Sequence, residues 1–396
     1  MNFLRYYFYY IILHLTLTGS SLLQIGDAIS VNLDTSATYK HSSNILKSES
    51  DEKSDRIFIF SPGAVLNLGK RGTALDLSLK AKYDILQYGD YKDLDNNQLK
   101  LYLNGSYNPS ELLNNSFSLS DVEGQIARSE TGTSGNPELV ERSTVTASFS
   151  SVYKYSPKLS FSFGLNQTDL TYDTHKDELS SKKSVIIPLK AIYQYSNKLS
   201  VVYGVTLNDT EVGQRKYGVI NLPAYETDSV YYNVGLNGTI LPKLTGQFDV
   251  GYRTLNFSTA TDDFNAFGAT SALTWTFSPK LRTTFNLSQD FDVAGSGSTY
   301  KFTRGNFSSV YSINSEYRLS INYGRTLKHF RGNTLNNPDP REDTLTNFSL
   351  NLHYVPSENY NFTAGYNYVK GDSDDINDYI DDYDLKEYRI SANFKY

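Results

Sequence analysis

The chain has 396 residues, a formal net charge of −6, 33 tyrosines and 21 phenylalanines, but no cysteine and only one methionine and one tryptophan. The lack of cysteine excludes disulfides, a thiol nucleophile and thiolate metal sites, and the negative net charge gives no reason to expect a nucleic-acid partner. The abundance of aromatic residues favours strand over helix.

The amino terminus has the order of a secretory signal peptide. An apolar run follows the single charge of Arg5 and leads to small residues at 19–21 and 26–28. We expect cleavage after Ala28, with Ser20 or Ser21 as alternative sites. A membrane-anchoring helix is the other interpretation, but the run is shorter than the roughly 20 residues that a spanning helix needs. The predicted division is a signal peptide over 1–28 and one domain over 29–396.

From about residue 31 to the end, the chain repeats short runs of alternating apolar and polar residues. Residues 75–83 and 159–165 show the alternation plainly. In an extended strand, successive side chains point to opposite faces, so each run has one apolar and one polar face. This period of two is typical of the strands of a transmembrane barrel.

The connections between these runs are of two kinds, which alternate. Eight are tight turns rich in Pro, Asn, Ser and Gly, at 69–71, 108–110, 156–158, 196–198, 241–243, 278–280, 314–316 and 356–358. Nine are longer polar loops, at about 41–55, 86–96, 124–140, 173–182, 211–226, 258–264, 292–300, 331–343 and 371–382. Seventeen connections predict an all-β, antiparallel, up-and-down barrel of 18 strands, with both termini on the side of the tight turns. Sixteen strands would result if the first hairpin or a short strand is misread, and a soluble sandwich or propeller is the alternative fold.

One face of the predicted strands carries charge. Nine basic residues lie on it: Lys80, Lys82, Lys100, Lys190, Arg253, Arg282, Arg318, Arg389 and Lys395. Four acidic residues share this face: Asp76, Asp84, Asp249 and Asp290. Such a face suits water rather than a packed core, so we expect it to line a lumen. The excess of bases predicts a preference for anions, unless a bulge slips the register and exchanges the two faces.

Aromatic residues gather just before the tight turns, which is where a barrel places its interfacial girdle. The predicted girdle is Tyr107, Tyr155, Tyr195, Trp275, Phe277 and Tyr354. The chain ends on an alternating run with Phe394 and a terminal Tyr396. That ending resembles the carboxy-terminal signal read by the barrel assembly machinery.

Two segments carry a family resemblance. The stretch 55–66, an aspartate followed by an apolar strand and Ser61-Pro62-Gly63, and the later hairpins of the type Tyr155-Ser156-Pro157-Lys158-Leu159 resemble the putative β-barrel porin 2 family. The resemblance implies an outer-membrane barrel. Relatives in this group include barrels associated with exopolysaccharide export, so it also suggests a saccharide exporter, and it supplies no catalytic residues.

Passage is the first functional hypothesis, because barrels of 16 to 18 strands leave an aqueous lumen unless something plugs it. We expect a porin-like channel in the outer membrane of a Gram-negative-type bacterium, in contact with lipids, lipopolysaccharide, the assembly machinery and, for an exporter, polysaccharide export components. A non-conducting structural or surface-display barrel is the alternative. A barrel hydrolase is the third, with His175 beside Asp173 and Asp177 as its best cluster, but we expect no enzyme and no cofactor.

The last long loop is acidic. It contains Asp372, Asp374, Asp375 and Asp378, whose oxygens could attract calcium or magnesium. The loop lacks the glycine and the terminal glutamate of an EF-hand at their required places. A solvated acidic loop, touching divalent ions that bridge lipopolysaccharide, is therefore favoured over a dedicated metal site.

Overall fold

The computed structural model describes residues 22–26, 28–49, 51–69, 74–133, 136–258, 264–330, 341–374 and 382–396. Within them, helix is limited to the short 3-10 segments η1 (Lys92–Leu94) and η2 (Arg128–Thr131), and no helix is long and apolar enough to cross a membrane. The strands are β1 (Leu23–Ile25), β2 (Ile29–Ser42), β3 (Asp55–Ser61), β4 (Gly63–Leu68), β5 (Leu75–Tyr88), β6 (Asn96–Ser110), β7 (Leu113–Ala127), β8 (Leu139–Lys154), β9 (Leu159–Tyr172), β10 (Lys182–Ser196), β11 (Leu199–Val212), β12 (Arg215–Tyr217), β13 (Ile220–Leu222), β14 (Tyr225–Leu241), β15 (Leu244–Phe257), β16 (Phe264–Ser278), β17 (Leu281–Val293), β18 (Thr299–Ser312), β19 (Tyr317–Phe330), β20 (Arg341–Ser357), β21 (Tyr360–Ser373) and β22 (Tyr383–Lys395).

The long strands form one closed antiparallel barrel of 18 strands, as the sequence predicts. Each pairs with its neighbour in the chain, and β22 closes the ring by pairing with β2, where Ala392 lies opposite Ala37. Strands β3 and β4 count as one barrel strand, since they are separated only by Pro62 and both pair with β2 and β5. Proline has no N–H for the ladder, and it therefore interrupts the strand without ending it.

Where the structure describes them, the tight turns lie at one end of the barrel and the longer connections at the other. Two turns differ from prediction by about two residues. Strand β6 runs through Pro109 to Ser110, and β20 runs through Pro356 to Ser357, so that the chain reverses just after them. Both prolines sit in a local shift of register, where the missing N–H costs no ladder hydrogen bond.

Pro188 lies in the middle of β10, a position that a paired strand normally forbids. Its partner position on β9 is Gly164, and the β9–β10 ladder lacks pairings between Ile186 and Leu189. A Cβ on Gly164 would lie 2.7 Å from Cγ of Pro188, so glycine leaves the room that the pyrrolidine ring occupies. The proline is thus accommodated by a local gap in the ladder.

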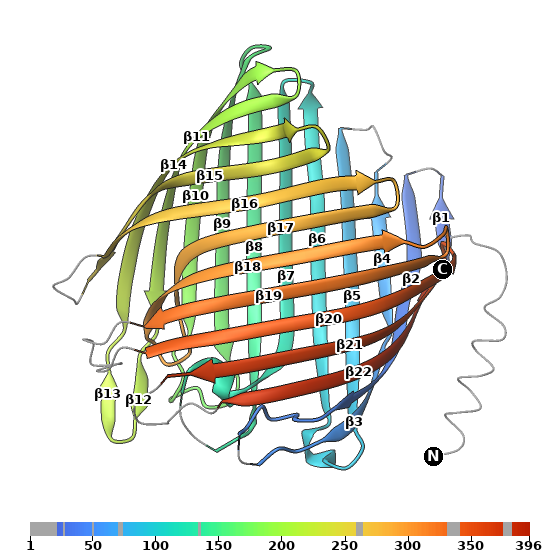
Figure 1. Cartoon of the computed structure of the whole chain (residues 1–396), viewed down its shortest axis with the longest axis vertical. Helices are drawn as coiled ribbons and strands as arrows, with labels where there is room; N and C mark the ends of the chain where they lie inside the picture. Colours follow the sequence, from blue (N-terminus) through green and yellow to red (C-terminus); the bar gives the residue numbers. More distant parts are fainter. Residues whose placement is uncertain are drawn as a thin grey trace.

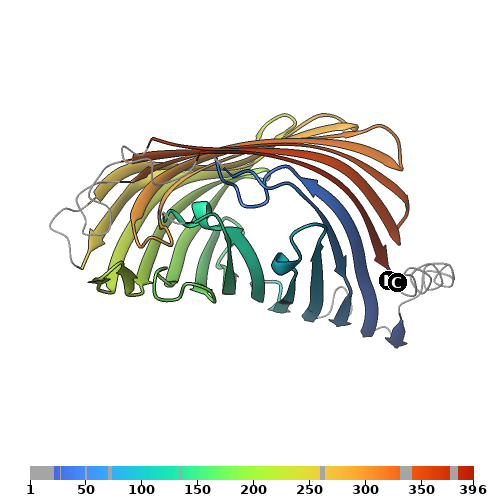
Figure 2. The same ribbon diagram turned by 90° about the horizontal axis from the view of Figure 1, so that it is seen from below.

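The barrel has two facing walls, β2 to β11 behind and β14 to β22 in front (Figures 1 and 2). Large apolar side chains such as Leu79, Phe163, Tyr203 and Ile390 point outward and are exposed. Lipid satisfies such a surface, while the backbone polar groups of the paired strands are hydrogen-bonded around the closed ring. Three small clusters of buried apolar residues occur, around Ile57, Val140 and Val369, and all lie toward the long-loop end.

Candidate functional site: the lumen

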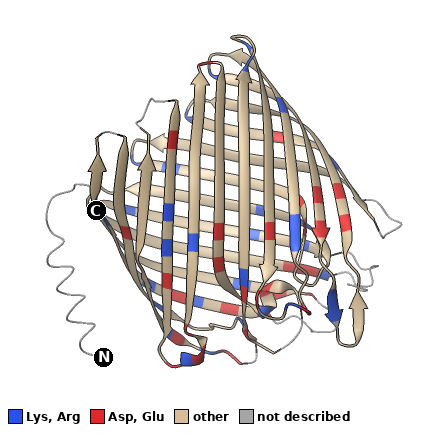
Figure 3. Ribbon diagram, turned by 180° about the vertical axis from the view of Figure 1, so that it is seen from behind, with Lys and Arg blue, Asp and Glu red and all other residues tan. Residues whose placement is uncertain are grey.

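The inner face of the barrel is polar. A cavity of about 930 Å³ is lined by residues of β2, β3, β5 and β17 to β22, which belong to both walls. Its lining includes amides from five strands of the front wall, Asn286, Asn306, Asn322, Asn351 and Asn393. Charged residues gather toward the long-loop end and are sparser toward the tight turns (Figure 3). The lumen can therefore hold water and polar solutes along its length.

Five of the nine predicted lumenal bases have a polar partner on the inner face. Three form ion pairs with acids: Lys80 with Asp34 at 2.6 Å, Lys100 with Asp84 at 2.5 Å and Arg253 with Asp290 at 2.7 Å. Lys82 donates to Ser36 and Arg389 donates to Asn351, both at 2.9 Å. The other four, Lys190, Arg282, Arg318 and Lys395, have no carboxylate within ion-pair distance among the described residues.

The strand register also places bases and acids on the inner face that were not predicted. The added bases are Lys40, Arg142, Lys154, Lys182, Arg304, Lys328 and Arg341, and the added acids are Asp34, Asp55, Asp292, Asp343 and Glu387. Bases still outnumber acids on this face. The alternation itself contained the signal: Asp292 follows Asp290 by two residues, so the two side chains point the same way.

Several bases near the long-loop end lie against aromatic rings. The guanidinium of Arg253 is 4.6 Å from the centre of the Tyr231 ring, and that of Arg341 is 4.1 Å from the Phe330 ring. Arg304 lies 5.2 Å from Phe302, and the Lys328 ammonium lies 5.3 Å from Tyr300. Such contacts hold a cation in place without neutralising it.

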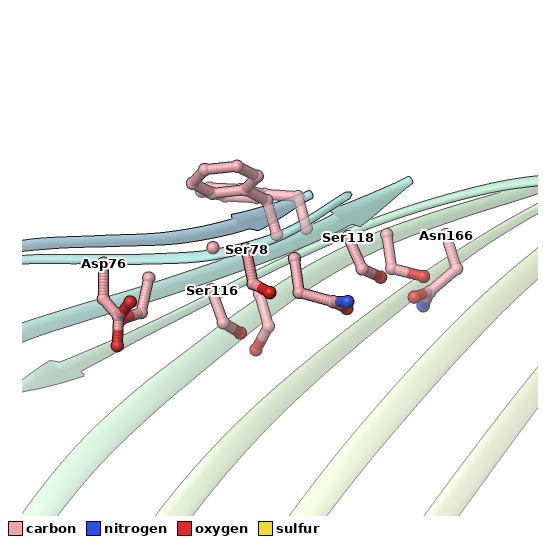
Figure 4. Close-up of a pocket in the computed structure, with 12 residues that line it drawn as sticks. Asp76, Ser78, Ser116, Ser118 and Asn166 are labelled. Carbon is pink, nitrogen blue, oxygen red and sulfur yellow. The ribbon is translucent and has the colours of Figure 1, made fainter. Parts of the chain in front are cut away.

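Part of the wall formed by β5 to β9, between its charged positions, is lined by neutral hydroxyls and amides. A cavity of about 400 Å³ on this wall is bordered by Ser78, Ser116, Ser118 and Asn166, with Asp76 as its one acid (Figure 4). Ser and Asn side chains both donate and accept hydrogen bonds, so this wall offers partners to solutes rich in hydroxyl groups.

The histidines are placed differently from the predicted hydrolase cluster. His175 contacts Glu138 at 3.0 Å and Glu178 at 3.7 Å, while Asp173 and Asp177 pair with lysines instead. His353 faces the lumen, where its two ring nitrogens lie 3.1 Å from the hydroxyls of Ser320 and Thr363. The structure therefore does not bring the predicted three residues together.

Residues 31–395 match the family described as putative beta-barrel porin 2. The chain belongs to this family. The match agrees with the resemblance carried by the stretch 55–66 and by the hairpins, and it makes the protein a porin-like barrel of the outer membrane. No curated protein matches the chain.

Several solved structures are similar to this porin-like barrel. The outer membrane protein OpdK from Pseudomonas aeruginosa is 9% identical, with 93% of this chain and 99% of that chain covered and a TM-score of 0.47. OccAB3 from Acinetobacter baumannii is 9% identical over 93% and 99% of the two chains, with a TM-score of 0.43. The siderophore receptor PirA from Acinetobacter baumannii is 6% identical over 94% and 81%, with a TM-score of 0.48.

The predicted girdle residues of this porin-like barrel lie at its tight-turn end. Tyr107, Tyr155 and Tyr195 are exposed, Trp275 stacks on Phe277 with ring centres 4.5 Å apart, and Tyr354 stacks on Tyr317 at 4.7 Å. Phe394 packs edge-on against Tyr360 at 5.5 Å, and the backbone of Tyr396 exchanges two hydrogen bonds with Leu33. The residues proposed as an assembly signal therefore lie on the strand that closes the ring.

The acidic last loop is only partly described, because Asp375 and Asp378 lie outside the described residues. Asp372 pairs with Lys370 at 2.5 Å, and the carboxylate of Asp374 accepts the backbone N–H of Glu342. In the part of the chain that the structure describes, no three His, Asp or Glu residues are arranged to hold a metal ion.

Proposed function

We propose that the protein is a passive, water-filled channel of the outer membrane that prefers anionic, hydroxyl-rich solutes. The observation that carries this proposal is the excess of bases over acids on the inward register of the described strands. Fixed charge lining a passage with low-dielectric walls attracts counter-ions and repels ions of its own sign.

The unpaired bases contribute most to that field. Lys80 and Lys100 are largely neutralised by the acids beside them. Lys190 at mid-depth and Arg282 and Arg318 near the tight turns have no such partner among the described residues, so their charge acts on whatever enters the lumen. We therefore expect the lumen to prefer anions from its tight-turn end to mid-depth.

Acidic saccharides combine both features of the lumen, since they carry negative charge and many hydroxyl groups. The serine- and asparagine-lined cavity between β5 and β9 would bind their hydroxyl groups, and the unpaired bases Lys190, Arg282 and Arg318 would attract their negative charge. Export of an exopolysaccharide, together with polysaccharide export components, is the form of this proposal that the family resemblance suggests. A non-conducting display barrel is the competing proposal.

We also propose that residues 1–28 are removed on secretion and that Phe394 and Tyr396 are read by the assembly machinery. Cleavage after Ala28 would remove β1, whose residues Leu23–Ile25 pair with Ile29–Val31 at the start of β2. The strand β2 would keep its pairings with β4 and β22.

Planar-bilayer recording under a salt gradient tests the proposal. We expect a reversal potential on the anion-selective side, reduced in the triple variant Lys190→Gln, Arg282→Gln and Arg318→Gln. Lys158→Gln is the matched control, because Lys158 lies in a tight turn outside the barrel wall. Cation selectivity of the wild type would refute the charge argument. The absence of both conductance and liposome swelling with neutral or acidic sugars would favour the display barrel.

A further inference from the structure

Two loops from opposite walls meet over the long-loop end of the lumen. One is η2 (Arg128–Thr131) with Gly132, which connects β7 to β8, and the other is the loop 294–298, which connects β17 to β18. Figure 1 places β7 and β8 on the rear wall and β17 and β18 on the front wall, and Figure 2 shows inward-folded loops between the two. We call these two segments together the strap.

The two halves of the strap are hydrogen-bonded to each other and anchored around the rim. The N–H of Ser296 donates to the carbonyl of Thr131 at 3.2 Å. The hydroxyl of Tyr225 donates to the carbonyl of Gly297 at 2.6 Å, and the N–H of Ser180 donates to that of Gly295 at 2.8 Å. Thr131 is 1% exposed and Ser296 is 6% exposed, so water is excluded from the junction.

A third loop clasps the strap from the side of β2 and β3. The ammonium of Lys47 lies 2.6 Å from the carboxylate of Glu130, and the hydroxyl of Ser129 donates to the carbonyl of Lys47 at 3.1 Å. Lys47 also lies 5.7 Å from the centre of the Tyr383 ring on β22. The strap is thus tied to three parts of the rim, although the contacts that join it are few and polar.

The strap lies against Arg341 of β20. A Cβ on Gly132 would be 3.1 Å from Nη2 of Arg341 and 3.3 Å from Cβ of Ala294, so nothing larger than glycine fits there without a shift. A solute leaving the lumen at this end has to pass the strap. Segments that fold into a large barrel occupy part of a lumen that its strands alone would leave open.

We propose that the strap is the constriction of the channel: it sets the largest solute that passes, and it has to part at the Thr131–Ser296 junction for saccharide-sized solutes. This inference rests on the proposed function as a channel. It assigns the size limit to the strap rather than to the barrel wall, because the wall alone encloses a lumen wide enough for water and solutes.

A reversible cross-link tests the inference. The chain has no cysteine, so the double variant Thr131→Cys with Gly295→Cys can form only one disulfide within a chain. A Cβ on Gly295 would lie 3.1 Å from Cβ of Thr131, shorter than the roughly 3.5–4.5 Å of disulfides, and 2.7 Å from the Tyr172 hydroxyl, so the loop 294–298 has to shift slightly for the disulfide to form. Each single cysteine variant, with and without reductant, is the control.

In the oxidised double variant, we expect liposome swelling with oligosaccharides to fall by about tenfold or more, and reductant to restore it. In the second variant, Ser129→Ala with Glu130→Gln, the clasp to Lys47 is broken, and larger solutes should pass. If the cross-linked channel passes the same oligosaccharides at the same rate as the reduced one, the inference is wrong.

The same experiment separates this inference from the proposed function. If the wild type passes nothing but the unclasped variant conducts, the strap is a closed lid, which supports the inference and contradicts a permanently open channel. If neither the wild type nor the unclasped variant passes any solute, both the channel and its constriction are refuted.

Discussion

At the long-loop end the inside of the barrel packs like a globular protein, whereas from mid-depth to the tight turns it lines water. The buried apolar residues Leu179, Val140 and Tyr172 pack together beneath the long loops. At mid-depth the same inner face carries Ser118, Ser148 and Asn166 around an open cavity. The difference shows that this barrel gains a packed core only where loops fold inward, since at mid-depth its inner face is lined by small polar side chains around open space.

The largest expected effect comes from removing part of that local core. Leu179 is 2% exposed, so Leu179→Ala should destabilise the long-loop end by about 2–5 kcal/mol, through lost burial and the cavity left behind. Limited proteolysis from the outside should then cleave the loop 173–181 faster. Leu189→Ala on the lipid face of β10 is the matched control. Equal protease resistance of the two variants would contradict a packed mouth.

Breaking an ion pair should likewise cost more stability near the long-loop end than at mid-depth. Arg253 is almost fully buried beside Asp290, whereas Lys80 beside Asp34 is about one third exposed. Asp290→Asn should therefore cost about 1–3 kcal/mol of unfolding free energy, because a hydrogen bond to a buried charge is weakened, and Asp34→Asn should cost less. Urea unfolding in lipid vesicles measures both, and a larger cost for Asp34→Asn would reverse the comparison.

The smallest expected effect concerns pH at the loops. A hydrogen bond from Arg128 holds the pKa of Glu178 below its ordinary value of 4.5. A lowered carboxyl pKa means that this contact stabilises the loops above the ordinary carboxyl range and is lost as the pH falls through the lowered pKa. Since Glu178 is half exposed, we expect less than about 1 kcal/mol. Protease resistance of the loops should fall on acidification in the wild type and change less in Glu178→Gln.

Much of the fold could be predicted because it follows from local alternation. The 18 strands agree with the structure, as do the tight turns and loops that it describes, apart from the turns after Pro109 and Pro356, which shift by about two residues. Those prolines indicated turns because they cannot donate to a ladder. In each of these strands the proline lies in a bulge, where no ladder hydrogen bond from its nitrogen is required. Whether a bulge forms depends on the pairing with the neighbouring strand.

The candidate site was predictable only in part. A period of two indicates which face each of Lys80, Lys82 and Lys100 occupies, but it does not indicate which acid lies beside each base. The pairs of Lys80 with Asp34 and Lys182 with Asp292 join strands that are not neighbours in the ring. The cluster proposed around His175 failed for the same reason, since its actual partners Glu138 and Arg128 come from another loop.

The sequence by itself determined the closed barrel and the sidedness of its strands, because alternation and turn chemistry act between residues close in the chain. The tertiary structure alone decided that Thr131 and Ser296 meet across the mouth. Two loops separated by eight of the 18 barrel strands come together only once the ring has closed, and no local pattern encodes that distance. The width of the passage is therefore a property of the closed barrel rather than of any one segment.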